Sequence, residues 1–306
     1  MFGFRPEGRA LLKGIDPFTG MLPYIMTTRT DAMCYCTQYA DSDVIQKYLR
    51  KKRLEGHNVS VMSLMIAAYV RTISQFPEIN RFVVGKKVYA RKELCISFVV
   101  VKIRKKDDFL DTTVKLYFDP RDTLFEVAEK VEKAIEDNRK VDNENSAEKV
   151  IQILRSIPGL VTVGVAILKG LDKVGWMPRA IVDASPFHSS LFFTNMGSIN
   201  LNSIYHHIYN FGTVSVFIAL GKREDKIKVD RKGNIGYQRV FPMGVVTDER
   251  VAAGAIFALA FDYLDRLLHN PEMLETPPET VRFDYKAEYR NRRDKDGKLK
   301  KKQKKS

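Results

Sequence analysis

The chain contains few cysteines and no long apolar run. Three cysteines in 306 residues are too few for a disulfide framework, which favours a reducing, cytoplasmic compartment. The longest apolar runs, at 159–168 and 251–261, are roughly half the ~20 residues that a membrane span needs. The first residues also lack the apolar core of a signal peptide. These absences predict a cytoplasmic protein, and a peripheral position at the inner membrane surface stays open.

Acidic residues are outnumbered by basic ones, and the imbalance is concentrated at one end. The net charge is +14, and residues 286–306 hold 11 basic and 3 acidic residues. This composition predicts a disordered basic tail after a domain at 21–285, with residues 1–20 as an N-terminal arm. A basic tail suits an anionic membrane surface. Its one aromatic residue, Tyr289, and the lack of a base-reading module argue against specific nucleic-acid binding.

Metal ligands are equally scarce. Cys34 and Cys36 lie two residues apart, so they share one face of a strand. No second Cys or His pair has ligand spacing, and the sequence therefore predicts packing for these two thiols and no metal site.

The pattern of apolar residues predicts alternating strands and helices. A long strand is expected over 24–40, a basic helix over 41–55 and a second helix between Ser60 and Pro77. A hairpin follows around Gly85. Further on, strands are expected at 94–103, 112–118, 189–194, 213–220 and 240–246, and helices at 123–135 and 248–268, the first of which opens with a capping box.

Residues 150–177 are apolar almost throughout and form the least expected segment. Lys169, Lys173 and Trp176 stand towards its end. The pattern favours helices packed on the domain or on a neighbouring subunit. An interfacial helix that touches a membrane is the alternative, because Trp and Lys at one edge suit that position. A lid over the site is a third reading.

The stretch Asp248-Glu249-Arg250-Val251-Ala252-Ala253-Gly254 joins a predicted strand to a predicted helix. Asp248 is placed to cap that helix. The stretch resembles the Asp-His-Arg-Val-x-Asp-Gly signature of the chloramphenicol acetyltransferase-like superfamily, and especially the catalytic domain of dihydrolipoyl acyltransferases. The order of elements over 20–275, with Pro-Glu-x-Asn at 77–80, resembles the same superfamily. Glu249 replaces the family's histidine, and Ala253 replaces its second aspartate.

The resemblance implies an α/β fold, a two-layer mixed-sheet sandwich of the coenzyme A-dependent acyltransferase type. It also implies a homotrimer with the site in a channel between subunits, and a coenzyme A thioester as acyl donor. The segment Thr194-Asn195-Met196-Gly197 resembles the family motif whose hydroxyl stabilises the tetrahedral oxyanion, so Thr194 takes that role. Asn195, Gly197, Asp248, Arg250 and Gly254 are expected to line or shape the channel. The alternative for Thr194 is an ordinary turn residue.

Glu249 determines what chemistry is expected. A thiol has a pKa of about 8.5 and a glutamate about 4.3, so the gap makes Glu a base worse by roughly 6 kcal/mol than a matched one. The corresponding deficit for a histidine is roughly 3 kcal/mol. Position at a helix start would stabilise the carboxylate further, whereas burial would act in the opposite direction. Glu249 is therefore a structural acid, a working base, or a group that binds a cationic or hydroxyl-bearing acceptor.

Three histidines near the predicted strand at 189–194 complete the candidates. His188 precedes that strand and His206 and His207 follow it, and His188 is the one expected to assist catalysis. The chain has no recognisable lipoyl domain, so no covalent lipoyl group is expected. The leading hypothesis is an acyltransferase with an altered motif and an unknown acceptor. The alternative is a catalytically inactive trimeric scaffold, with or without membrane association.

Overall fold

A computed structural model describes residues 5, 7–11, 15–105, 108–140, 156, 159–229, 232–287 and 289. The predicted basic tail lies outside the described residues from position 290 onward, as do most of the residues between 150 and 158. Within the described part, no helix is both long enough and apolar enough to cross a membrane.

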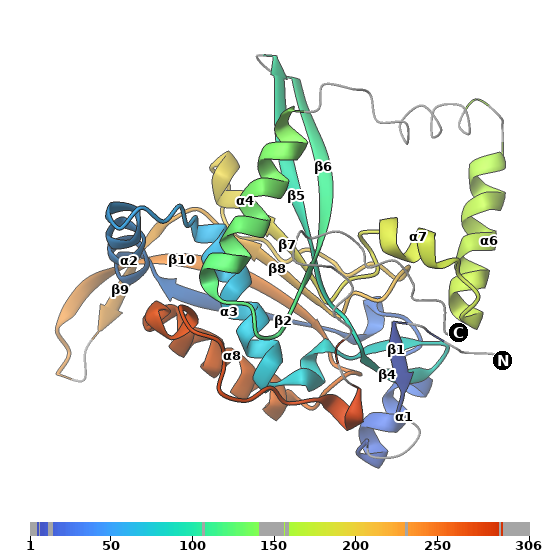
Figure 1. Ribbon diagram of the computed structural model, residues 1–306. Helices are drawn as coiled ribbons and strands as arrows, with labels where there is room; N and C mark the ends of the chain where they lie inside the picture. Colours follow the sequence, from blue (N-terminus) through green and yellow to red (C-terminus); the bar gives the residue numbers. More distant parts are fainter. Residues whose placement is uncertain are drawn as a thin grey trace, which may run out of the picture.

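The centre of the protein is a seven-stranded mixed sheet (Figure 1). Its strands follow the order β2-β10-β8-β7-β5-β6, and β9 pairs with the free end of β10. The β5–β7 and β7–β8 pairs are parallel and all other pairs are antiparallel. The strands are β2 (Met33–Asp41), β5 (Leu94–Lys105), β6 (Asp108–Phe118), β7 (Leu191–Asn195), β8 (Val216–Leu220), β9 (Glu224–Val229) and β10 (Ile235–Asp248).

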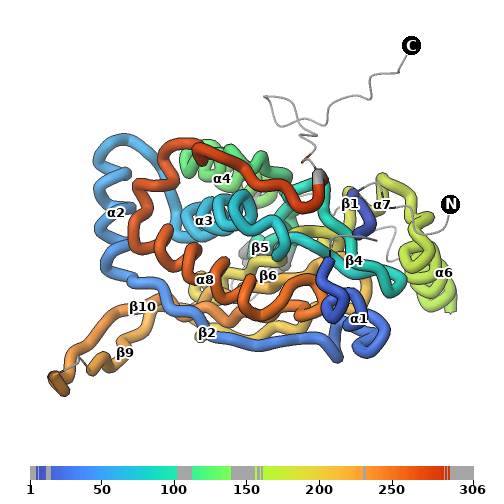
Figure 2. Tube along the Cα trace, turned by 90° about the horizontal axis from the view of Figure 1, so that it is seen from below, coloured from blue at the N-terminus to red at the C-terminus, as the bar shows by residue number. Residues whose placement is uncertain are grey.

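Four helices cover one face of this sheet and enclose the main hydrophobic core. The most buried is α3 (Val61–Gln75), which packs against α4 (Leu124–Lys140) and α8 (Gly254–His269). The basic helix α2 (Ser42–Leu54) lies beside them (Figure 2). Ser60 caps α3 by accepting a hydrogen bond from the Ser63 backbone N–H. The sheet and its helical layer confirm the predicted two-layer α/β sandwich.

The other face of the sheet is crossed by an extended strap, residues 200–210. The strap runs so close to β10 that a Cβ on Gly244 would lie 2.1 Å from the Ile204 carbonyl oxygen. His206 stacks on Phe217 of β8 with ring centroids 4.2 Å apart. The Thr37 hydroxyl on β2 is hydrogen-bonded to the Tyr205 hydroxyl. The strap therefore closes a second, smaller apolar cluster around Phe192, Phe217 and Val246.

A three-stranded sheet and three helices form one end of the molecule. The sheet has the order β1-β4-β3. The predicted N-terminal arm overlaps two of these elements, since β1 pairs with β4 and α1 follows at once. The elements of this end are β1 (Gly8–Ala10), α1 (Pro17–Ile25), β3 (Phe82–Val84), β4 (Lys87–Arg91), α6 (Leu160–Val174) and α7 (Arg179–Ala184).

Five short 3-10 turns complete the described chain. They are η1 (Thr30–Ala32), η2 (Pro77–Asn80), η3 (Met196–Ile199), η4 (Pro271–Leu274) and η5 (Asp284–Lys286).

Most predicted elements are confirmed, and the largest error in a strand boundary is at the start of β2. The capping box at the start of α4 is present, with the Thr123 backbone N–H donating to Glu126 and the Glu126 N–H to the Thr123 hydroxyl. The strand predicted from residue 24 begins only at Met33. Residues 24–25 belong instead to α1, which Asp16 caps and Pro17 opens. Local helix-start signals there outweigh the apolar pattern.

Candidate functional site

The turn after β10 is built around a buried ion pair. The Asp248 side chain is fully buried, and both its oxygens accept hydrogen bonds from the Arg250 guanidinium, at 2.8 and 2.7 Å. Arg250 also donates to the Met26 carbonyl at 3.0 Å, and so ties the turn to the end of α1. Arg29 approaches Asp248 to 3.9 Å, and burial lowers the pKa of Arg29 to about 10. Asp248 and Arg250 therefore fix the shape of the turn.

The predicted helix start is wrong by six residues. Helix α8 begins at Gly254, and its N-cap is Ala253, which offers no side-chain hydrogen bond. Asp248 is consequently not a helix cap, because its carboxylate is occupied by Arg250. Glu249 likewise lies outside the first helical turn. The stabilisation that a helix dipole gives to a first-turn carboxylate falls off within that turn and does not apply here.

Glu249 lies partly exposed at the tip of the turn. Its backbone N–H donates to the Ala32 carbonyl at 3.0 Å, which holds it against the start of β2. Its carboxylate accepts a hydrogen bond from the exposed Cys34 thiol, with 3.5 Å between sulfur and oxygen. Partial burial and the charge of Glu249 raise the pKa of Cys34. The thiol therefore stays protonated near neutral pH and donates its hydrogen bond to the Glu249 carboxylate.

The sequence alone did not pair Cys34 with Glu249. The pairing follows from the antiparallel register of β2 and β10, in which Cys34 lies opposite Thr247. Arg29 was also missed, because nothing in its local sequence indicates that it would be buried against the Asp248 turn. Among the described residues, no group of three or more His, Cys, Asp or Glu side chains is arranged to hold a metal ion.

Thr194 lies at the end of β7 and carries an unused hydroxyl. Its Oγ1 is buried and has no hydrogen-bond partner within the described residues. Asn195 follows and caps a short 3-10 turn by accepting from the Ser198 N–H at 3.2 Å. Gly197 fits tightly, because a Cβ there would lie 2.9 Å from the Gly221 carbonyl oxygen. The Thr194 hydroxyl therefore lies beside a tightly packed turn with its hydrogen-bonding capacity unused.

One chain does not bring Thr194 and Glu249 together. Thr194 pairs with Ala219 of β8, and Ala219 pairs with Gly244 of β10. Glu249 lies five residues beyond Gly244, so it is displaced from Thr194 by about 16 Å along the strand direction. The two strand spacings from β7 to β10 add about 10 Å across the sheet. Any site that uses both side chains would therefore require a second copy of the chain.

His188 belongs to a separate buried network. Its Nε2 lies 3.1 Å from Asp172 Oδ1 and its Nδ1 2.8 Å from the Ser185 hydroxyl. Arg5 binds the same aspartate at 2.5 Å. Burial lowers the pKa of His188 despite this aspartate. Burial alone would raise the pKa of Asp172, but the His188 hydrogen bond and the Arg5 charge lower it to about 2. In this arrangement His188 anchors α6 to the domain.

The remaining candidates are accounted for by packing. His206 stacks on Phe217, and its Nδ1 lies 2.9 Å from the His207 carbonyl. Gly254 opens α8 with nothing within 4 Å of the position that a Cβ would take, so no close approach requires glycine there.

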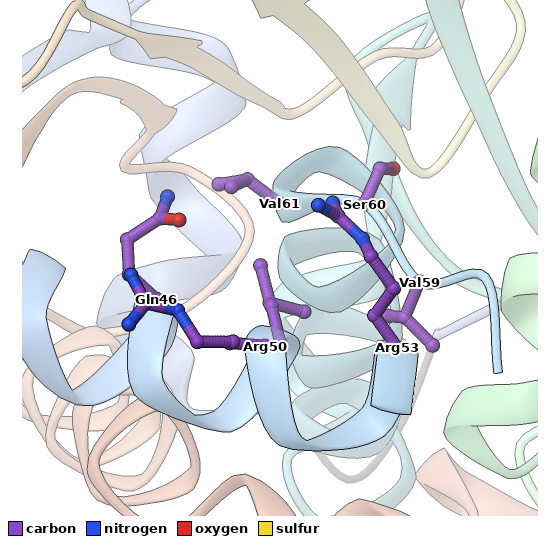
Figure 3. Close-up of a pocket in the computed structure, with 7 residues that line it drawn as sticks. Gln46, Arg50, Arg53, Val59, Ser60 and Val61 are labelled. Atoms are coloured by element: carbon purple, nitrogen blue, oxygen red, sulfur yellow. The ribbon is translucent and has the colours of Figure 1, made fainter. Parts of the chain in front are cut away.

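A cavity of about 350 Å³ lies between α2 and the start of α3 (Figure 3). It is lined by two arginines among mostly neutral residues: Gln46, Leu49, Arg50, Arg53, Val59, Ser60 and Val61. This cavity is remote from the Asp248 turn. Helix α2 follows Asp41, which pairs with Val240, eight residues or about 26 Å along β10 from Asp248. It therefore does not contribute to the site at the turn.

Comparison with known proteins identifies the fold of the chain and does not identify its activity. No family model and no curated protein matches the sequence. Among solved structures, the probable dihydrolipoamide acetyltransferase of Listeria monocytogenes 4b F2365 matches with a TM-score of 0.52 and 12% identity, over 85% of this chain and 95% of that one. The Azotobacter vinelandii dihydrolipoamide acetyltransferase gives 0.53 and 14%, over 86% and 93%.

A chloramphenicol acetyltransferase matches with a TM-score of 0.50 and 11% identity, over 85% of this chain and 99% of that one. The cubic core of a pyruvate dehydrogenase multienzyme complex also matches, with a TM-score of 0.52 and 14% identity, over 86% and 93%. These matches cover nearly the whole of the matched chains. The chain therefore has the fold of the chloramphenicol acetyltransferase-like superfamily, shared with the catalytic cores of the dihydrolipoamide acetyltransferases.

Proposed function

We propose that the protein is an acyltransferase that moves an acyl group from a coenzyme A thioester to an acceptor, at a site completed between copies of the chain. The observation that carries this proposal is the buried, unpartnered Thr194 hydroxyl at the end of β7. Burying a hydroxyl without a hydrogen bond costs free energy, so a partner from a substrate would relieve the cost. A tetrahedral oxyanion is such a partner, and one donor can stabilise it by about 3 kcal/mol.

The other side chains take supporting roles in this proposal. Asp248 and Arg250 hold the turn, and Glu249 presents a carboxylate at its tip. A carboxylate is a poor base for a thiol, so Glu249 acts on a substrate proton weakly or binds an acceptor that carries a cation or a hydroxyl. The three cysteines are free thiols, which is compatible with the cytoplasmic location that we propose.

A catalytically inactive binding protein is the second candidate, and the α8 N-terminus favours it. Ala253 leaves the helix without a side-chain cap, and the histidine position is occupied by Glu249. The family's histidine and second aspartate are both absent from this one turn, which is typical of a protein that has lost catalytic activity. In that case the coenzyme A channel would bind without turnover.

Substituting Thr194 tests the proposal directly. Thr194→Ala is expected to lower the release of coenzyme A thiol from acetyl-coenzyme A, assayed with a broad acceptor panel, by about 10²–10³-fold, because the oxyanion loses its donor. Thr194→Ser keeps the hydroxyl and is expected to retain most of the rate. Equal rates for wild type and Thr194→Ala would remove Thr194 from the mechanism. Coenzyme A binding without any thiol release by the wild type would favour the inactive binding protein.

We also propose that the chain assembles into a homotrimer, and the β9–β10 ribbon supports assembly. The ribbon projects from the sheet (Figures 1 and 2). Register pairs Ile227 with Tyr237 and Val229 with Ile235, so these four side chains share one face, and each is at least 60% exposed. An isolated two-stranded ribbon is marginally stable in water. A neighbouring copy that covers this apolar face would stabilise it.

Charged substitutions on that face are expected to dissociate the assembly. Ile227→Lys with Tyr237→Lys should shift the wild-type oligomer towards monomer in sedimentation equilibrium, because two desolvated apolar contacts are lost at each interface. Lys228→Gln, on the opposite face of the same strand, is the matched control and should leave the oligomer intact. A wild-type protein that is monomeric across micromolar concentrations would refute assembly through the ribbon.

A further inference from the structure

Two apolar helices are exposed at the end of the molecule opposite the ribbon. On α1, Phe18, Met21, Tyr24 and Ile25 are 55–71% exposed and recur at helical spacing on one face. On α6, Val161 and Val165 lie on one side and Val163 and Ile167 on the other, and all four are at least 40% exposed. A helix that is apolar all round is normally buried. Within the described residues nothing covers this part of α6.

These two helices lie at the same end of the molecule (Figures 1 and 2). The β3–β4 turn connects them. A Cβ on Gly85 would lie 3.1 Å from the Lys173 carbonyl of α6, and the Lys86 ammonium lies 5.6 Å from the Tyr24 ring of α1. Trp176 follows α6 and is 55% exposed. We use the name α1/α6 surface for the exposed residues of α1, α6 and the β3–β4 turn, together with Trp176.

The exposed charges of the α1/α6 surface are mostly positive. Its exposed charged residues are Lys86 and Lys87 in the β3–β4 turn and Lys169 and Lys173 on α6. Of the carboxylates at these elements, Asp172 is buried and paired with Arg5 and His188, whereas Asp16, the exposed N-cap of α1, accepts hydrogen bonds from the Thr19 N–H and hydroxyl. The described chain ends at Tyr289, which contacts Asn80 near the same three-stranded sheet, and the sequence continues from there into the basic segment.

We propose that the α1/α6 surface docks on an anionic lipid bilayer, with its apolar side chains in the interfacial layer and its four lysines at the headgroups. Amphipathic segments with Lys on the polar side and Trp at the boundary bind membranes in this way. A second copy fits less well, because a two-fold contact of this surface with itself would place lysines opposite lysines. The ribbon lies at the far end (Figure 1), so docking leaves assembly through the ribbon unobstructed.

The single tryptophan of the chain provides a local probe. Vesicles of phosphatidylcholine and phosphatidylglycerol at 7:3 are added to the full chain, and flotation and Trp176 emission are measured. We expect flotation at low salt together with a shift of the emission to shorter wavelength, and neither with pure phosphatidylcholine. Flotation without an emission shift would mean that the basic segment alone binds lipid, and would overturn the proposal. Absence of flotation would overturn it as well.

Matched variants then locate the contact. Val163→Asp with Ile167→Asp is expected to weaken vesicle binding at least tenfold, because two side chains leave the apolar layer. Leu54→Asp with Leu259→Asp makes the same chemical change at positions 85% and 60% exposed elsewhere, and should bind like wild type. Lys169→Gln with Lys173→Gln should weaken binding about fivefold for each lysine removed. Equal binding by the α6 double variant and wild type would refute the surface assigned here. Self-association that the α6 substitutions abolish, without vesicle binding by the wild type, would assign the surface to a second copy instead.

Discussion

Replacing Glu249 by histidine and Ala253 by aspartate in one variant is expected to raise thiol release from acetyl-coenzyme A by about 10²–10⁴-fold, the usual contribution of a general base. The imidazole has a pKa about two units nearer to that of a thiol than a glutamate carboxylate has. The turn that would carry it is already fixed by the Asp248–Arg250 pair and by the hydrogen bond from the Glu249 N–H to Ala32. The substitution therefore changes the base without changing its support.

The position of Ala253 gives this experiment an internal control. Ala253 is the N-cap of α8 and makes no side-chain hydrogen bond, so an aspartate there can accept from the first-turn N–H groups. Ala253→Asp alone is expected to raise the free energy of unfolding by about 1 kcal/mol. By itself it should not restore the rate. A gain that appears in this single variant would be a stability effect and would not come from the base.

The opposite result would identify a working carboxylate. If the double change lowers the rate and Glu249→Gln abolishes it, Glu249 is the base and the motif has been retuned. Its proton acceptance would then depend on burial in the assembled channel, since burial favours the protonated carboxyl. No change in any variant would support the inactive binding protein.

The fold was predictable because its signals are local and agree with one another. The Ser60 cap, the Thr123–Glu126 capping box and the Gly85 hairpin each lie where the sequence places them. Short apolar runs likewise identified β5, β6, β8 and β10. Each of these features depends on residues a few positions apart, so a single sequence is enough to find them.

The start of α8 was misplaced because a long-range contact decides it. Asp248 has the composition of an N-cap, but Arg250 occupies its carboxylate, and that pair is anchored by Met26, more than 200 positions earlier in the chain. The contact between Cys34 and Glu249 depends in the same way on the register of two strands. The Thr194 hydroxyl is unused because no hydrogen-bonding group of the described residues lies within its reach, and no sequence pattern indicates such a gap. Candidate residues were thus predictable by type, while their partners were not.

Arg250→Met is expected to lower the free energy of unfolding by about 3–5 kcal/mol, because it leaves the Asp248 carboxylate buried without its bidentate partner. The Met26 carbonyl would lose its donor in the same variant. Arg29, 3.9 Å from Asp248, is the nearest cation that can move in, so the loss should fall towards the lower end of this range if it does.

Two further variants separate the ion pair from simple loss of an arginine. Asp248→Leu with Arg250→Met removes both charges and should recover much of the stability, because no unpaired ion remains. Arg266→Met breaks the Arg266–Asp262 pair, whose side chains are 58% and 73% exposed, and should change stability little. The measurement is urea unfolding, with an unchanged m-value as the sign that only stability has moved. A small loss for Arg250→Met, equal to that for Arg266→Met, would show that the Asp248 turn does not need its buried pair to hold Glu249 in place.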